Sequence, residues 1–141
     1  MGSLNYHHIS TLPRLHYIVW CRLPDAEGRP GGVVRPALVR ATKRDNKSGR
    51  AAVLVSYGTT VLDTNRCRGI DLIIQNNGRL SQLDLPQAVR FDLGLSNWLP
   101  WAVEFFEAPE HSLFMVAGPL NASEIERLRA CLRERGVVTA L

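Results

Sequence analysis

Two short apolar segments carry the side chains best suited to chemistry. Residues 31–40 contain Arg35, and residues 53–60 contain Thr59. Both segments are rich in β-branched and aliphatic residues, as β-strands commonly are. The polar stretch between them, residues 43–50, contains several turn-forming residues. The sequence therefore predicts a β-hairpin that brings Arg35 and Thr59 close together.

The open end of this hairpin is a candidate phosphate-binding corner. With the turn centred near residues 46–47, antiparallel pairing places Arg35 opposite Gly58 or Thr59. Arginine offers a planar fork of hydrogen-bond donors, threonine offers a hydroxyl, and glycine lets a ligand approach the main chain. These residue types are also common at strand ends in proteins that have no active site. Further candidates for substrate contact are Gly31, Gly32, Thr60, Lys43, Arg44 and His16.

Three segments in this region share their residue order with a known family. They read Tyr-Ile-Val-Trp at 17–20, Arg-Pro-Ala-Leu-Val at 35–39 and Tyr-Gly-Thr at 57–59. Together they resemble the PemK/MazF family of toxin endoribonucleases, with a weaker similarity at residues 118–124. Residues 90–101 differ from the better-known members, so the chain is similar to a divergent PemK-like branch.

The resemblance implies a mainly β fold, a small SH3-like barrel with a C-terminal amphipathic helix. It also implies metal-independent, cofactor-free cleavage of single-stranded RNA, in which the ribose 2′-hydroxyl attacks the adjacent phosphate. Arg35 and Thr59 are the residues that match the family's cleavage pair. The implied partners are a second copy of the chain, forming a homodimer, and a cognate antitoxin of a type II toxin–antitoxin system.

The sequence does not identify the group that accepts the 2′-hydroxyl proton, and it allows two alternative functions. Arginine is a poor general base because it stays protonated far above neutral pH, so an unusual environment, His16 or water must assist Arg35. The same barrel without catalysis would be a nucleic-acid-binding module or an inhibitor of a protein such as gyrase. A third alternative is an interaction protein whose aromatic residues at 98–106 form the partner surface, although such aromatics more often lie in a core.

The composition favours one basic domain. The chain has 141 residues, with 17 Lys and Arg against 13 Asp and Glu, giving a formal charge of +4. This excess mildly favours a polyanionic partner. We expect residues 15–141 to form the domain and residues 1–14 to be a mobile arm or an edge segment. Three scattered cysteines and no membrane-length apolar run predict a cytoplasmic protein with neither disulfides nor a metal site.

The remaining elements follow from periodicity and turn signals. Asn121 as N-cap, Glu124 in the first turn and an apolar stripe predict an amphipathic helix over 121–135. The dipeptide Asn77-Gly78 between two apolar runs predicts a second hairpin. Several short strands then surround one small core. The other expected elements are strands at 15–23, 70–75, 79–85, 89–93, 96–99 and 113–117 and a helical turn at 101–107.

Overall fold

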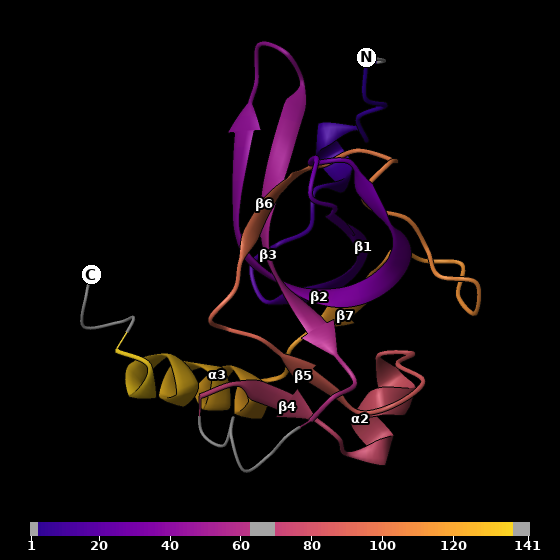
Figure 1. Ribbon diagram of the computed structural model, residues 1–141. Coiled ribbons are helices and arrows are strands. Elements are labelled where there is room, and N and C mark those ends of the chain that lie inside the picture. Colours follow the sequence, from indigo (N-terminus) through magenta and orange to yellow (C-terminus); the bar gives the residue numbers. More distant parts are fainter. Residues whose placement is uncertain (1–2, 63–69, 137–141) are drawn as a thin grey trace.

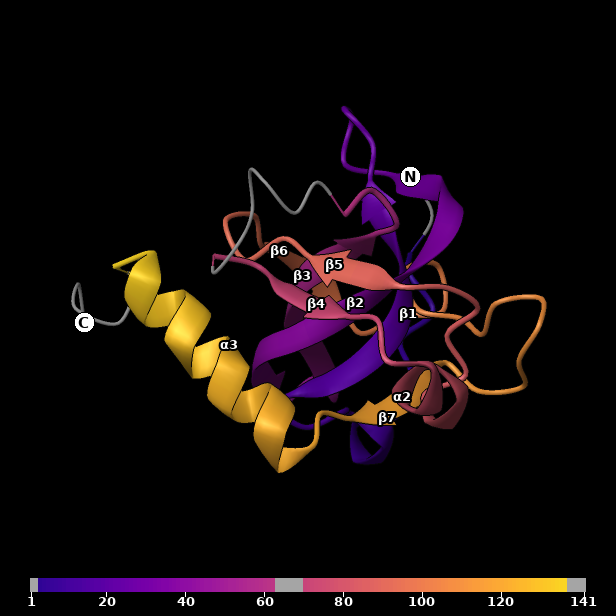
Figure 2. The ribbon, with the colours of Figure 1, turned by 90° about the horizontal axis from the view of Figure 1, so that it is seen from below.

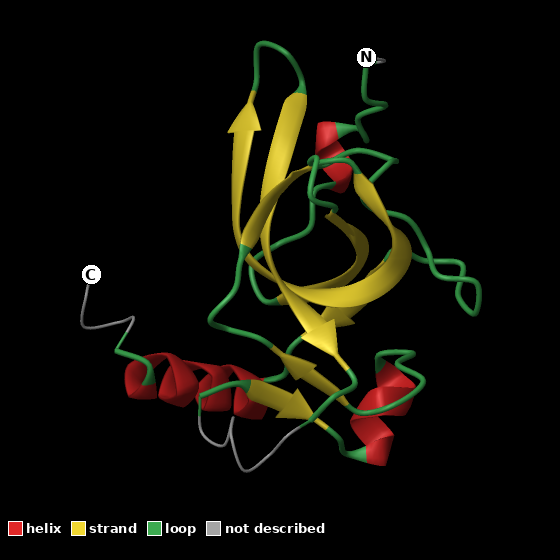
Figure 3. Cartoon of the chain, in the orientation of Figure 1, coloured by secondary structure: helices red, strands yellow, loops and turns green. Residues whose placement is uncertain are grey.

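The computed structural model describes residues 3–62 and 70–136, and the fold is mainly β with one C-terminal helix (Figure 3). This confirms the expected class at that level. The elements are η1 (Ile9–Thr11), β1 (Tyr17–Pro24), β2 (Pro30–Asp45), β3 (Arg50–Thr59), β4 (Leu72–Ile74), α2 (Asn77–Gln82), β5 (Val89–Phe91), β6 (Asn97–Pro100), β7 (Val116–Pro119) and α3 (Ala122–Glu134).

The strands form one antiparallel sheet that curls upon itself (Figure 1). The strand order is β4-β5-β3-β2-β1-β7, and β6 pairs with β3. From Ala37 to Val39 the β2–β3 hairpin has the expected register, since Leu38 faces Ser56 and Val39 faces Val55. The expected pairing of Arg35 with Gly58 or Thr59 is wrong, because β2–β3 pairing ends at Ala37 and Arg35 pairs with Cys21 of β1. The register shifts between Val39 and Ala41. Such an irregularity bends a strand, and β2 curves strongly along its length.

The sheet has a hydrophobic cluster on each face, which corrects the expectation of a single core. Alternate side chains of a strand point to opposite faces, so Ile18 and Trp20 enter one cluster while Val19 and Cys21 enter the other. The first cluster is completed by β4, β5, α2 and α3, which gather at one end of the molecule (Figure 1). The second cluster lies inside the curl and includes Trp101.

Helix α3 confirms the prediction for the C-terminal segment. The Asn121 side chain accepts a hydrogen bond from Glu124 N, and the Glu124 carboxylate accepts one from Asn121 N, so a complete capping box is present. Leu128 and Cys131 are buried against the first cluster. Glu124 is also buried and forms an ion pair with Arg79 of α2 at 2.7 Å. The helix therefore lies along the same end of the molecule as α2, β4 and β5 (Figure 2).

The predicted second hairpin is wrong. Residues 77–82 form α2, and the Asn76 side chain accepts a hydrogen bond from Arg79 N at its start. Asparagine caps helices as readily as it forms turns, and here the cap prevails because a helix lets Leu80 reach the core together with Leu83.

One of two expectations for the segment before α3 changes. The strand expected at 113–117 begins only at Val116, and Leu113 and Phe114 are exposed. The helical turn expected at 101–107 is confirmed, since Phe105 N and Phe106 N both donate to Ala102 O.

The N-terminal segment is packed along an edge of the fold. Tyr6 forms a β-bridge with Ala102, and His7 N donates to Trp101 O at 3.0 Å. Asn5 donates from both its backbone and its side chain to the Glu104 carboxylate. Of the two descriptions that the sequence allowed, residues 3–14 therefore match an edge segment rather than a free arm.

None of the described helices is both long and apolar enough to span a membrane.

Candidate functional site

The site arises where the two strands of the first hairpin separate. Pairing between β2 and β3 ends at Ala37 and Tyr57. Beyond that point Arg35 pairs with Cys21 on β1, whereas Thr59 pairs with Arg90 on β5. The two strand ends thus follow different neighbours, and a cavity of about 590 Å³ opens between them.

This cavity brings together four of the residues predicted from the sequence. Arg35, Gly58, Thr59 and Thr60 all line it, and the buried Trp20 lies beside them. The other lining residues are Val33, Val34, Pro36, Val61, Leu85, Pro86, Gln87, Val89, Pro109 and His111. The cavity therefore combines one cationic group and a few polar groups with largely apolar walls, which is typical of ligand-binding sites.

Arg35 is available to a ligand. Its side chain is exposed and makes no hydrogen bond or ion pair with any residue that the structure describes. By contrast, Arg22 is paired with Glu107 and Arg79 with Glu124. An unpaired guanidinium on a cavity wall presents its planar fork of donors to an anion.

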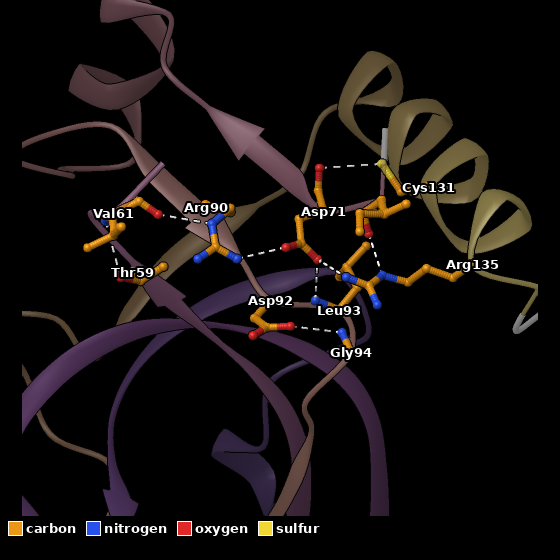
Figure 4. A network of polar contacts seen from close by, with 10 residues as sticks. Thr59, Val61, Asp71, Arg90, Asp92, Leu93, Gly94, Cys131 and Arg135 are labelled. Carbon is orange, nitrogen blue, oxygen red and sulfur yellow. Dashed lines mark hydrogen bonds and ion pairs between the residues drawn. The ribbon is translucent and has the colours of Figure 1, made fainter. Parts of the chain in front are cut away.

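Thr59 is held in place by a chain of hydrogen bonds (Figure 4). Its Oγ1 accepts a bond from Val61 N at 3.2 Å, and Val61 O accepts one from Arg90 Nε at 2.9 Å. Arg90 Nη1 in turn donates to Asp71 Oδ2 at 2.7 Å. Because the Thr59 oxygen acts as an acceptor in this chain, its hydroxyl proton stays available for donation to a ligand.

Asp71 anchors this chain to the C-terminal helix. Its side chain is 2% exposed and also accepts hydrogen bonds from Leu93 N and from Arg135, just beyond α3. Burial acts to raise the pKa of Asp71, but the Leu93 N–H and the guanidinium groups of Arg90 and Arg135 outweigh it and hold that pKa below its usual value. The carboxylate thus stays ionised and keeps both arginines in position.

Gly58 is required by packing at the point where the strands separate. A β-carbon at this position would lie 2.5 Å from Val89 Cγ1 and 2.9 Å from Pro36 O. The second neighbour is a backbone atom that cannot easily give way. Glycine therefore serves here to let β3 pass between β2 and β5, which accounts for its presence without a ligand.

Four of the other candidates lie outside the cavity lining. The carbonyl groups of Gly31 and Gly32, at the start of β2, accept hydrogen bonds from Arg22 of β1. Lys43 and Arg44 lie toward the far end of the β2–β3 hairpin, which projects at the top of Figure 1. The Lys43 ammonium lies over the Trp98 ring, 4.2 Å from its centroid.

His16 also lies away from the cavity lining, at the start of β1. Its backbone has a φ of 71°, its N–H donates to Val39 O, and its carbonyl accepts from Leu120 N. Burial, followed by the charges of Arg129 and Arg40, lowers the pKa of His16. Burial and the charge of Arg135 lower the pKa of Arg40, whose side chain donates to Ser56 Oγ at 3.0 Å. These residues form a separate basic cluster.

His111 is the lining residue that sequence reasoning missed. It lies in the segment between β6 and β7, and its Nε2 is 2.9 Å from Asp84 O. Its ring also makes a T-shaped contact with Trp20, with 5.2 Å between the ring centroids. No local pattern around His111 indicates this position, because both partners are far away in the sequence.

Within residues 3–62 and 70–136, no three His, Cys, Asp or Glu side chains are grouped so that they could hold a metal ion. Cys67 lies outside the described residues, and Cys21 and Cys131 are free thiols.

Neither a scan of protein-family models nor a search of curated proteins finds a match to this chain.

Proposed function

We propose that this protein is an endoribonuclease that cleaves single-stranded RNA in the cavity between β2 and β5. The observation that carries the proposal is the presence of Arg35 and Thr59 on one cavity, together with Gly58 and Thr60. The resemblance of residues 17–59 to the PemK/MazF family supports the same activity, because these two residues match the family's cleavage pair.

The proposed chemistry uses the ribose as its own nucleophile. The 2′-hydroxyl attacks the adjacent phosphate and the 5′-oxygen of the next nucleotide leaves, a route open only to RNA. Arg35 neutralises the charge that develops on the phosphoryl oxygens, and the Thr59 hydroxyl donates a hydrogen bond to one of them. A guanidinium in this place supplies charge stabilisation without a metal ion. In-line attack requires an unstacked nucleotide, so single strands are the substrate.

The biological setting of the proposal is a type II toxin with a PemK/MazF-like barrel, a cognate antitoxin and a homodimeric state. The curled sheet with a C-terminal helix is compatible with that barrel. The aromatic stretch at 98–106, which the sequence offered as a partner surface, is mostly buried. Trp101, Phe105 and Phe106 are in the second cluster, and of its aromatic residues only Trp98 is substantially exposed. A dimer must therefore use another surface.

A second candidate function is nucleic-acid binding without cleavage. The basic cluster of His16, Arg40 and Arg129 favours it, because it adds positive charge outside the cavity. Within the described residues, the Arg40 side chain has a hydroxyl partner but no carboxylate partner. Such a cluster attracts phosphates whatever the chemistry of the cavity.

The two candidates are separated by following a labelled single-stranded RNA on a gel, with and without EDTA. The proposed enzyme cleaves in both conditions and leaves a 2′,3′-cyclic phosphate. Arg35→Ala should reduce cleavage by about 10²-fold or more, the scale of losing one oxyanion donor. Thr59→Val keeps the β-branched shape and should also impair cleavage. Binding without cleavage by the wild type would favour the second candidate.

Matched variants distinguish the role of Arg35 from a loss of charge. Arg133→Ala removes another exposed arginine, on α3, and should leave cleavage unchanged. Arg35→Lys keeps the charge but loses the planar fork, so it should recover only part of the activity. Equal cleavage by the wild type, Arg35→Ala and Thr59→Val would refute the assignment of this pair.

A further inference from the structure

The proposed cleavage needs a group that removes the proton from the 2′-hydroxyl, and the cavity offers one. Arg35 cannot do so at neutral pH, because a guanidinium stays protonated. His16, the histidine that the sequence pointed to, lies outside the cavity lining. Among the described residues that line the cavity, His111 is the one whose side-chain type exchanges a proton between about pH 5 and 8.

We infer that His111 is the general base of this site, accepting the 2′-hydroxyl proton on Nδ1. The inference rests on the proposed function and adds a residue to it that neither the sequence pattern nor the resemblance indicated. It depends on which ring nitrogen carries the proton, and the surroundings of the ring determine this.

The hydrogen bond to Asp84 fixes the tautomer. His111 Nε2 lies 2.9 Å from Asp84 O, and a carbonyl oxygen can only accept. The neutral imidazole must therefore carry its proton on Nε2, which leaves a lone pair on Nδ1. Asp84 has a φ of 54°, a left-handed conformation unusual for a residue other than glycine. That turn directs the Asp84 carbonyl at the imidazole ring.

Two further contacts suit the ring to this role. The T-shaped contact with Trp20, with an interplanar angle of 77°, restricts the orientation of the imidazole. The Asp84 carboxylate lies 3.9 Å from Nε2, so a negatively charged group stands beside the ring that takes up the proton.

In the proposed cleavage step, the O2′–H proton moves to His111 Nδ1, and the O2′ oxygen forms a bond to phosphorus. The bond from phosphorus to the 5′-oxygen breaks, and that oxygen takes a proton from bulk water. Imidazolium then returns its proton to water, so the enzyme is restored. The products are a 2′,3′-cyclic phosphate and a free 5′-hydroxyl.

The test combines a variant, a pH profile and chemical rescue on a labelled single-stranded RNA of mixed sequence. His111→Gln should lower the cleavage rate at neutral pH by about 10²-fold, the usual contribution of a general base. The wild-type rate should rise with pH through one ionisation, and this limb should be absent in His111→Gln. Added imidazole should restore part of the rate to His111→Ala. His8→Gln, an exposed histidine outside the cavity lining, is the control and should cleave normally.

Failure of this inference is distinguishable from failure of the proposed function. If Arg35→Ala abolishes cleavage while His111→Gln retains the wild-type rate and pH profile, the inference alone is refuted. A slower His111→Gln that keeps the wild-type pH profile, with a His111→Ala that gains nothing from imidazole, indicates a purely structural role and also refutes it. If wild-type protein leaves the RNA intact under all conditions, the proposed function fails and the inference fails with it.

Discussion

Replacing Asp71 by asparagine tests whether the buried carboxylate stabilises the fold at the end that carries the candidate site. The substitution preserves the shape of the side chain and removes its charge. In the wild type the carboxylate accepts hydrogen bonds from Arg90, Arg135 and Leu93 N, and its side chain is only 2% exposed. The variant removes the carboxylate charge that two largely buried guanidinium groups share.

The expected loss of stability is about 3 kcal/mol, the lower end of the range for breaking a buried ion pair. The lower end applies because the Arg90 and Arg135 side chains keep 14% and 19% of their surface exposed, so water can partly solvate them. For a chain of this length, about 4 °C of melting temperature corresponds to each kcal/mol. We therefore expect Asp71→Asn to melt about 12 °C below the wild type.

The effect should depend on pH in one direction. The pKa of Asp71 is held below its usual value, so the unfolded chain takes up this proton at a higher pH than the folded chain does. The stabilisation is therefore complete above about pH 4, the range of a free aspartate, and is lost as the pH falls through the folded-state pKa. The stability gap between the wild type and Asp71→Asn should be constant near neutral pH and close in acid.

Urea unfolding followed by circular dichroism, at pH 7 and in steps down to pH 2, measures both quantities. Glu126→Gln removes one carboxylate from the exposed face of α3 and is the matched control, with an expected change within about 0.5 kcal/mol. A loss below about 1 kcal/mol for Asp71→Asn would contradict the reasoning, because it would mean that the two arginines find adequate solvation without the carboxylate. A stability gap between the wild type and Asp71→Asn that stays constant into acid would also contradict the reasoning.

Two further substitutions test the packing around the site and the start of α3. Gly58→Ala should destabilise the fold by about 1–3 kcal/mol, because its β-carbon would meet Pro36 O. Gly32→Ala is the control and should leave the stability unchanged, because its β-carbon would have no atom within 4 Å. Equal melting temperatures for the two variants would contradict the packing account. Asn121→Ala removes one half of the capping box and should cost about 1 kcal/mol in urea unfolding, so an unchanged midpoint would show that Glu124 alone maintains the helix start.

Local signals in the sequence were sufficient for the first hairpin and for α3. The hairpin register follows from the turn and from alternating apolar residues, and the helix follows from its cap and stripe. Both are properties of neighbouring residues. The register was therefore correct at Leu38 and Ser56, and the capping box formed as expected at Asn121.

The wrong predictions came from residues whose local sequence fits more than one structure or whose partners are far away in the sequence. Asn76 begins a helix where the sequence favoured a turn, because the same side chain satisfies either and only the burial of Leu80 decides between them. His111 could not be found from its neighbours in sequence, since its partners Trp20 and Asp84 come from β1 and from the segment after α2. His16 was close to the site in sequence order but does not line the cavity.

The hairpin register predicted that Arg35 and Thr59 are close together, but it could not predict the cavity between them. The hairpin pairing brings Arg35 and Thr59 to the same region, but a continued ladder would leave no room for a ligand between them. Space arises because β2 continues along β1 while β3 turns to pair with β5, and Gly58 allows this crossing. Thr59 is consequently bonded to Val61, which Arg90 holds, and Arg90 is in turn held by Asp71. The position of the proposed catalytic threonine thus depends on a buried carboxylate outside the cavity lining.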